Sequence, residues 1–156
     1  MQVQMYERTC NMQVIFKIIF MDAIKKRSDC PISCSLDVWG DRWSLLIIRD
    51  LMFKKQCTYG DFLKSDEKIA TNILASRLQT LEENGVIDKL DHPDSKAKVL
   101  YRLTEKGIDL LPLMIEINIW ANKYFSLPED RKAIVKEVKK GKEKFIKSWI
   151  KELKKP

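Results

Sequence analysis

Leucines recur at helical spacing in the middle of the chain. Leu74, Leu78 and Leu81 fall at positions i, i+4 and i+7, so they lie on one face of a helix predicted over residues 69–84. Gly85 suits the left-handed conformation that commonly follows a helix. The pattern therefore predicts a helix with a narrow buried stripe and a wide solvent-facing side.

Three shorter helices are predicted before this one. Cys30–Pro31 marks the start of the first, with proline at a position where its missing N–H is not needed, and Gly40 ends it. Asp41 can cap a second helix whose apolar residues face the core: Trp43, Leu46, Ile47 and Leu51. Thr58 can cap a third, and the polar residues 65–68 form a turn of the length found in a helix-turn-helix.

A β-hairpin is predicted after Gly85. Val86–Leu90 and Val99–Leu103 have strand-like composition, and the polar segment Asp91–Lys98 lies between them. Thr104 then caps a further helix. The order of these elements predicts a mainly α fold with a short antiparallel β hairpin, arranged as a winged helix-turn-helix.

The helix predicted from Thr104 to Tyr124 carries more apolar residues than one core face requires, and Pro112 is expected to bend it. These residues are Leu110, Leu113, Met114, Ile117, Trp120 and Tyr124. A second buried surface is implied. We therefore expect the chain to be dimeric through its terminal helices.

Composition allows one ordinary core. The chain has 156 residues, of which 45% are apolar, and no long linker divides it. Residues 30–128 are expected to form the domain, with an N-terminal extension over 1–29 and a basic helix over 129–156. The formal charge of +7 favours polyanions without choosing among nucleic acid, acidic protein and membrane surface.

The basic tail has two interpretations. Residues 129–155 hold eleven Lys and Arg against five Asp and Glu, so most of the excess charge lies there. The tail can pack as a dimer arm through Phe145, Trp149 and Leu153, or it can add nonspecific affinity for DNA. Its aromatic residues favour packing.

The N-terminal extension contains the apolar run Val14–Ile24, which Lys17 interrupts and which is too short to cross a bilayer. It suits a weak signal-like segment, a helix that packs on a partner, or translated sequence upstream of a start at Met21. The four cysteines in a lysine-rich chain predict reduced thiols, a cytoplasmic location and no membrane partner.

The outer face of the helix over 69–84 is made of small and amide side chains. Asn72, Ala75, Ser76 and Gln79 lie opposite the leucines, and such residues let a helix approach base edges in the major groove of double-stranded DNA. A solvated face with no partner is the alternative. Among hairpin residues, Lys96 and Lys98 can reach phosphates or the minor groove and Arg102 can hold the DNA backbone, or all three can be solvated.

The motifs in the sequence do not indicate an enzyme. No Gly-rich phosphate loop, metalloprotease motif or nucleophile elbow is present. Cys30, Cys34, Cys57 and His92 do not have the spacing of a common zinc site. We expect neither an enzyme nor a cofactor.

Five segments, taken together, resemble the HxlR-type transcriptional regulators, which are winged-helix relatives of the MarR-like proteins. Cys30–Pro31 opens the similarity, which extends to about Tyr124. The other matching segments are Trp39–Leu51, Tyr59–Leu63, Ile69–Leu78 with Leu81–Ile87, and Tyr101–Gly107. One such motif would be weak, but five in the order of the family are specific.

The resemblance implies a homodimer on a palindromic operator, with the helix over 69–84 in the major groove. It also implies that Thr71, Asn72, Ser76 and Arg77 face DNA. Arg77 projects toward the flank of the leucine stripe, so a phosphate contact or a pair with Glu82 or Glu83 suits it better than a base contact. The alternative function is a winged-helix module that binds protein or RNA without specific DNA readout.

Some members of the family sense oxidants or electrophiles through a cysteine at the position of Cys30. A thiol at a helix N-terminus, near Lys25, Lys26 and Arg27, should have its thiolate favoured. A packing cysteine without a sensing role is the alternative.

Overall fold

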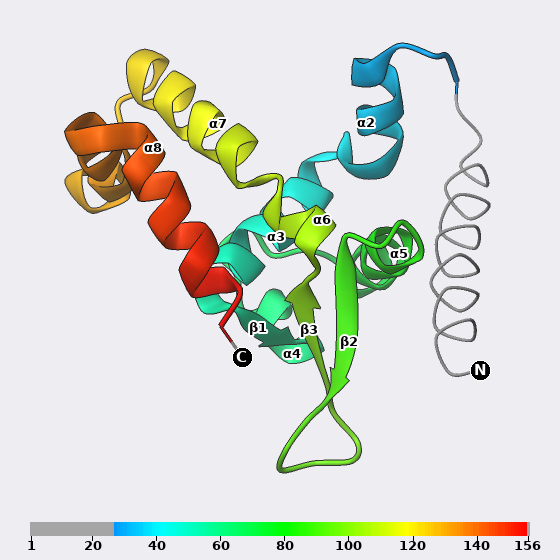
Figure 1. Ribbon diagram of the computed structural model, residues 1–156. Coiled ribbons are helices and arrows are strands. Elements are labelled where there is room, and N and C mark those ends of the chain that lie inside the picture. Colours follow the sequence, from blue (N-terminus) through cyan, green and yellow to red (C-terminus); the bar gives the residue numbers. More distant parts are fainter. Residues whose placement is uncertain (1–26, 156) are drawn as a thin grey trace, which may run out of the picture. The chain divides into compact units, whose positions relative to one another are not determined.

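The computed structural model describes residues 27–155 (Figure 1). The chain divides into two parts after Gly40, and each part is described by itself. The predicted N-terminal extension, including Met21 and the run Val14–Ile24, lies almost entirely outside the described residues. No helix within 27–155 is both long enough and apolar enough to cross a membrane.

The first part contains one described helix, α2 (Pro31–Trp39), with proline in its first turn as predicted. Arg27 forms an ion pair of 2.5 Å with Asp37 and also donates its backbone N–H to that carboxylate. The helix ends at Gly40, where an added Cβ would lie only 2.4 Å from the carbonyl oxygen of Leu36. Glycine is therefore required at this close approach.

The second part is a winged helix-turn-helix followed by further helices. Its elements, in chain order, are α3 (Arg42–Lys54), β1 (Gln56–Thr58), α4 (Tyr59–Leu63), α5 (Thr71–Glu83), β2 (Ile87–Asp91), β3 (Val99–Leu103), α6 (Glu105–Ile108), α7 (Leu111–Tyr124), the 3-10 helix η1 (Glu129–Lys132) and α8 (Ala133–Leu153).

Side-chain caps fix the starts of three of these helices, as the sequence predicted. The Asp41 carboxylate accepts hydrogen bonds from the backbone N–H groups of Trp43 and Ser44, at 2.9 and 3.0 Å. Thr58 and Asp61 form a reciprocal capping box at α4. The Thr104 hydroxyl accepts from the N–H of Gly107 at α6. Such caps satisfy N–H groups that the first helical turn leaves without partners.

The sheet has three antiparallel strands in the order β1-β3-β2. The sequence predicted the hairpin of β2 and β3 to within one residue, but it did not predict β1. Cys57 of β1 pairs with Tyr101 of β3, and on the other side of β3 Tyr101 pairs with Lys89. The middle strand is therefore held on both edges, and the hairpin tip extends beyond the sheet (Figure 1).

The core lies between the helices and one face of this sheet. Fully buried side chains come from nearly every element: Ile48 and Leu51 of α3, Phe62 of α4, Leu74 and Leu81 of α5, and Leu111 and Ile115 of α7. Trp43 and Leu46, which were also predicted to face the core, are only half-buried. Arg42 lies over the Trp43 ring, 5.2 Å from its centre.

The single long helix predicted from Thr104 to Tyr124 is wrong. The structure has a short α6 that ends at Ile108 and a separate α7 that begins at Leu111. Pro112 lies in the first turn of α7, where it needs no N–H partner, and so it does not bend a continuous helix.

The last helix, α8, packs along α7 (Figure 1). Val135 and Val138 are buried. The Trp149 ring lies 5.4 Å from the Phe53 ring, and its indole N–H donates to the carbonyl of Met52 at 3.4 Å. Gly141 has non-helical backbone angles and divides α8 into two segments. The basic tail therefore contacts its own chain through Trp149.

Candidate nucleic-acid interface

Helix α5 is anchored by its leucines. Leu74, Leu78 and Leu81 have exposed fractions of 0%, 2% and 0%. Burying three leucine side chains contributes on the order of 5 kcal/mol of favourable transfer free energy, so the helix has a firmly defined rotation about its axis. The opposite face is consequently fixed toward solvent.

The opposite face of α5 is exposed, and its side chains are small or polar. Thr71, Asn72, Ala75, Ser76 and Gln79 are all exposed. The side chains of Asn72 and Ser76 make no hydrogen bond within residues 27–155, whereas Gln79 donates to Glu83 on the same helix at 2.8 Å. Asn72 and Ser76 therefore present free donors and acceptors, while Gln79 must leave a partner to contact anything else.

The N-terminus of α5 is open. Its N-cap residue is Ala70, which has no side-chain oxygen, so the first N–H groups of the helix receive no side-chain cap. The first turn of the helix is held by Tyr59, whose hydroxyl donates to the carbonyl of Thr71 at 2.7 Å. Open N–H groups together with the positive end of the helix dipole suit a phosphate oxygen.

Arg77 has a different partner from the one expected. Its guanidinium lies 3.5 Å from Asp41, the cap of α3, rather than beside Glu82 or Glu83. Glu82 pairs instead with Lys89 of β2, at 2.5 Å. Because Asp41 also accepts three hydrogen bonds at the start of α3, the Arg77 pair joins the two helices at a point where both are anchored.

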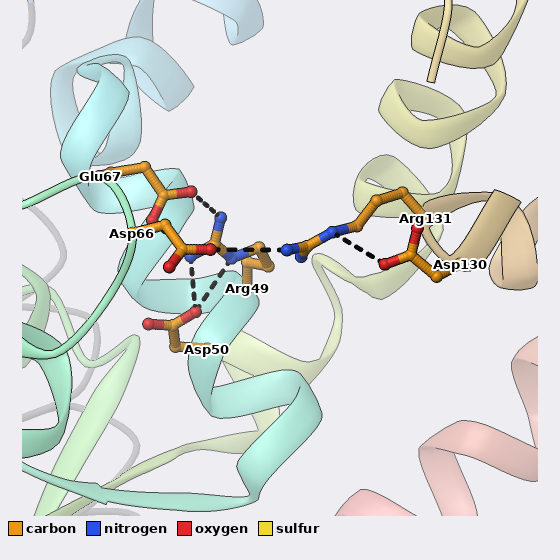
Figure 2. A network of polar contacts seen from close by, with 6 residues as sticks. All are labelled: Arg49, Asp50, Asp66, Glu67, Asp130 and Arg131. Carbon is orange, nitrogen blue, oxygen red and sulfur yellow. Dashed lines mark hydrogen bonds and ion pairs between the residues drawn. The ribbon is translucent and has the colours of Figure 1, made fainter. Parts of the chain in front are cut away.

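A second polar contact fixes the turn before α5. Figure 2 shows Arg49 of α3 between Asp50 and Glu67, with hydrogen bonds of 2.5 and 3.1 Å to Glu67 and of 2.8 and 2.9 Å to Asp50. The bonds to Arg49 lower the pKa of Glu67 to about 2. Glu67 lies two residues before the buried Ile69, so this ion pair holds the turn that sets the start of α5.

The same turn is contacted from the C-terminal half of the chain. Arg131 of η1 lies 3.5 Å from Asp66 and 3.7 Å from Asp130 (Figure 2). All three side chains are largely exposed, so this contact contributes little to stability.

The hairpin residues predicted to meet DNA separate into two groups. Lys96 and Lys98 are exposed near the tip, and neither forms an ion pair within the part of the chain that the structure describes. Arg102 lies near the end of β3 that is farther from the tip. It is opposite Asp88 in the sheet, and its guanidinium lies 3.9 Å from the Asp88 carboxylate. Arg102 lines a hollow with residues of α3, α6 and α8.

The thiols differ in accessibility. Cys30 is the exposed N-cap of α2, and Cys34 is half-buried with its thiol donating to the carbonyl of Ser28 at 3.2 Å. Cys57 is buried, and burial raises its thiol pKa to about 11. Cys10, Lys25 and Lys26 lie outside the described residues. Arg27, the one described cation among those predicted near Cys30, is paired with Asp37.

The chain is similar to known helix-turn-helix regulators. It is 34% identical over 89 residues to the HTH-type transcriptional regulator sll1512 of Synechocystis sp., and the match covers 57% of this chain and 65%, just under two thirds, of that protein. It is 32% identical over 96 residues to the HTH-type transcriptional regulator YodB of Bacillus subtilis, a match that covers 61% of this chain and 85% of YodB.

The chain is also similar to proteins of known structure. The crystal structure of PA1607 is 43% identical, with a TM-score of 0.58, over 67% of this chain and 71% of that one. The quinone-bound structure of YodB is 30% identical, with a TM-score of 0.52, over 61% of this chain and 99% of YodB. The oxidised form of the redox regulator HypR is 25% identical, with a TM-score of 0.56, over 63% of this chain and 100% of HypR.

The family model described as HxlR-like helix-turn-helix matches residues 38–129, which are more than half of the chain. This range contains the anchored helix α5, the turn that precedes it and the hairpin that follows. The relatives are transcriptional regulators rather than enzymes. The chain therefore belongs to the HxlR-like helix-turn-helix family of transcriptional regulators.

Proposed function

We propose that this regulator binds a specific DNA sequence as a homodimer on a palindromic operator, with α5 of each subunit in the major groove. The observation that carries the proposal is the division of α5 into a buried leucine face and an exposed face, where the Asn72 and Ser76 side chains make no hydrogen bond within residues 27–155. A helix so divided can enter a groove without losing its packing. A cytoplasmic location is part of the proposal, because the regulator must reach DNA.

Contacts to the phosphate backbone would complete the interface. The open N-terminus of α5, with Thr71 in its first turn, suits one phosphate. Lys96 and Lys98 at the hairpin tip suit phosphates or the adjacent minor groove. Ala75 allows close approach, and Gln79 and Arg77 would first have to release Glu83 and Asp41.

The homodimer is supported by apolar side chains that one chain leaves exposed. Ile117, Trp120, Tyr124 and Phe125, on and just after α7, have exposed fractions between 39% and 59%. The Trp120 ring lies 5.2 Å from that of Tyr124 and 5.7 Å from that of Phe125. Clustered exposed aromatic residues are typical of protein interfaces.

Selection from a random duplex pool, followed by anisotropy measurements over a range of salt concentrations, tests sequence reading. Asn72→Ala should reduce the preference for the selected sequence by about 1 to 3 kcal/mol per half-site. Lys96→Ala should weaken binding to all DNA sequences similarly. It should also reduce the slope of log affinity against log salt concentration by about 1. If the intact dimer enriches no duplex sequence, the alternative interaction module is favoured.

We also propose that Cys30 makes DNA binding responsive to electrophiles or oxidants. The support is its exposure at the N-terminus of α2, together with the similarity to YodB, which is known in a quinone-bound form, and to the redox regulator HypR. Treatment with p-benzoquinone should lower DNA affinity in the unmodified protein and in Cys34→Ser, but not in Cys30→Ser. An equal response of Cys30→Ser would contradict this role.

A further inference from the structure

A hollow of about 820 Å³ lies away from the exposed face of α5. It is formed where the last turn of α3, the edge strand β1, the middle strand β3, the short α6 and the end of α8 come together. Small-molecule sites in proteins commonly have volumes of about 300 to 1,000 Å³. The hollow is therefore large enough for a compact organic molecule.

Positive charge dominates the walls of the hollow. Five cationic side chains from three distant segments of the chain line it: Lys54, Lys55, Arg102, Lys154 and Lys155. Two carboxylates, Asp88 and Glu105, also line it. The fold has therefore gathered a net cationic lining from residues that are remote in sequence.

Several of these cations are only weakly engaged. Lys54 forms no ion pair within residues 27–155. Arg102 and Asp88 are 3.9 Å apart, and both side chains are about half exposed. Lys55 lies at the same distance of 3.9 Å from Glu152. Long, exposed ion pairs contribute little, so these cations can turn toward another anion at small cost.

Apolar residues also line the hollow. Leu51, Leu103 and Ile108 are buried at 0%, 8% and 4% exposure, and the half-buried Leu153 of α8 lines the same space. A lining that combines cations with apolar residues suits a molecule that has a negative head and an apolar body, since the cations can bind the head and the apolar residues can contact the body.

We propose that this hollow binds a small organic carboxylate with an apolar body. Lys54 and Arg102 hold the carboxylate, and the half-buried Leu153 side chain contacts the body. Asp88 competes with the ligand for Arg102. No residue of the exposed α5 face or of the hairpin tip lines the hollow, and Arg102 is the one predicted DNA contact that it includes.

A second hollow supplies the main competing location. It is more apolar, measures about 500 Å³ and is lined by Phe53, Phe145 and Trp149, with Lys55 as its one cation. A ligand held there would be recognised by its apolar body rather than by its charge. The dependence of binding on the charge of the ligand therefore distinguishes the two locations.

Calorimetric titration of the full chain, without DNA, with 2-naphthoate and with the neutral 2-naphthamide tests the proposal. We expect saturable binding of one 2-naphthoate per chain and at least about tenfold weaker binding of the amide, because the amide lacks the charge that the lysines and Arg102 recognise. Equal binding of the two compounds, or no saturation by 2-naphthoate, would overturn the proposal. The second result is also expected if these cations serve duplex phosphates instead.

Three variants locate the site. Lys54→Gln combined with Arg102→Gln should weaken 2-naphthoate binding about tenfold or more. Asp88→Asn should strengthen it several-fold, because the competing carboxylate is removed, and misfolding cannot explain a gain. Lys139→Gln, an exposed change of the same charge elsewhere on α8, should leave binding unaltered.

Amide chemical shifts provide a readout that does not depend on folding of the variants. Addition of 2-naphthoate to the unmodified protein should shift the signals of Arg102, Thr104, Ile108 and Leu153. Shifts confined to Phe145 and Trp149 would place the ligand in the second hollow and overturn the assignment.

Discussion

Glu67 accepts two hydrogen bonds from Arg49, and this one residue links α3 to the turn that starts α5. The turn has few other fixed points. Lys68, the next residue, has a positive φ of 51°, a conformation that costs free energy in a residue with a side chain. The ion pair therefore offsets local strain at the place where the direction of α5 is set.

Replacing Glu67 with Gln should lower stability near neutral pH by about 1 kcal/mol, because a charged acceptor is lost from a partly buried pair. Since the folded-state pKa of Glu67 is about 2 and its ordinary value is 4.5, its stabilisation is complete above pH 4.5 and is lost as the pH falls toward 2. Urea unfolding of the two proteins from pH 7 to pH 2 measures this.

The expected outcome is a stability difference that shrinks in that pH window. Glu143→Gln is the matched control, because Glu143 is exposed and forms no ion pair within residues 27–155. A difference that stays constant down to pH 2 would show that the Glu67 charge does not support the turn.

Arg77 illustrates what single residues in a sequence do not reveal. A helical projection placed it correctly at the edge of the leucine stripe, but its partner Asp41 lies on another helix, 36 residues earlier in the printed sequence. Projection finds neighbours on the same helix and none across the fold. Arg49 and Glu67 escaped sequence reasoning for the same reason, since nothing in the sequence links residues that are distant along the chain.

At the scale of elements, the sequence correctly predicted those helix ends that depend on residues close by in the chain. Asp41, Thr58 and Thr104 cap helices as predicted, and Gly85 has the expected positive φ of 65° after α5. These residues act on backbone groups within three or four positions, so their effect can be predicted from the sequence alone.

Elements that depend on a distant partner were missed or misplaced. Strand β1 has only three residues, too few to show alternation, and it exists because β3 offers an edge for pairing. The break between α6 and α7 carries no strong breaker before Pro112. Gly107 in α6 lies against Val86, a close approach between elements that the sequence does not reveal.

Gly107→Ala should destabilise the protein by about 2 kcal/mol. The added Cβ would lie 2.3 Å from the carbonyl oxygen of Val86 and 2.9 Å from the Leu103 side chain, and a backbone atom cannot move aside easily. Chemical denaturation measures the loss. The shift of β2 that follows should also perturb amide signals along the hairpin.

The matched control is Gly60→Ala in α4, where the nearest atom to an added Cβ is 3.9 Å away. Alanine there should be neutral or stabilise by up to about 1 kcal/mol, because it favours the helix. If both substitutions lower the stability equally, close packing around Gly107 does not explain the loss.

At the scale of the whole molecule, α7 and α8 differ in what their aromatic side chains contact. Trp149 of α8 contacts Phe53 and Met52 within the chain, whereas Trp120 and Tyr124 of α7 are more than half exposed. The sequence indicated a second apolar surface on α7, and the exposed aromatics agree with that expectation. It did not reveal that Trp149 packs on α3.

Trp120→Ala combined with Tyr124→Ala should raise the dissociation constant of the proposed dimer about tenfold or more, with little effect on unfolding of the monomer, because both rings are exposed in one chain. Trp149→Ala should instead cost about 2 kcal/mol of monomer stability. Sedimentation equilibrium and denaturation at several protein concentrations separate the two effects. Unchanged association in the double variant would move the interface elsewhere.

The position of β3 in the middle of the sheet has a consequence for divergence within the family. Because β1 and β2 both hold it, the stem of the hairpin is fixed by two ladders of hydrogen bonds, whereas residues 92–98 are attached only at their ends. Insertions and deletions in that loop leave every ladder intact. Related proteins can therefore acquire a longer or shorter hairpin tip without refolding the domain that carries it.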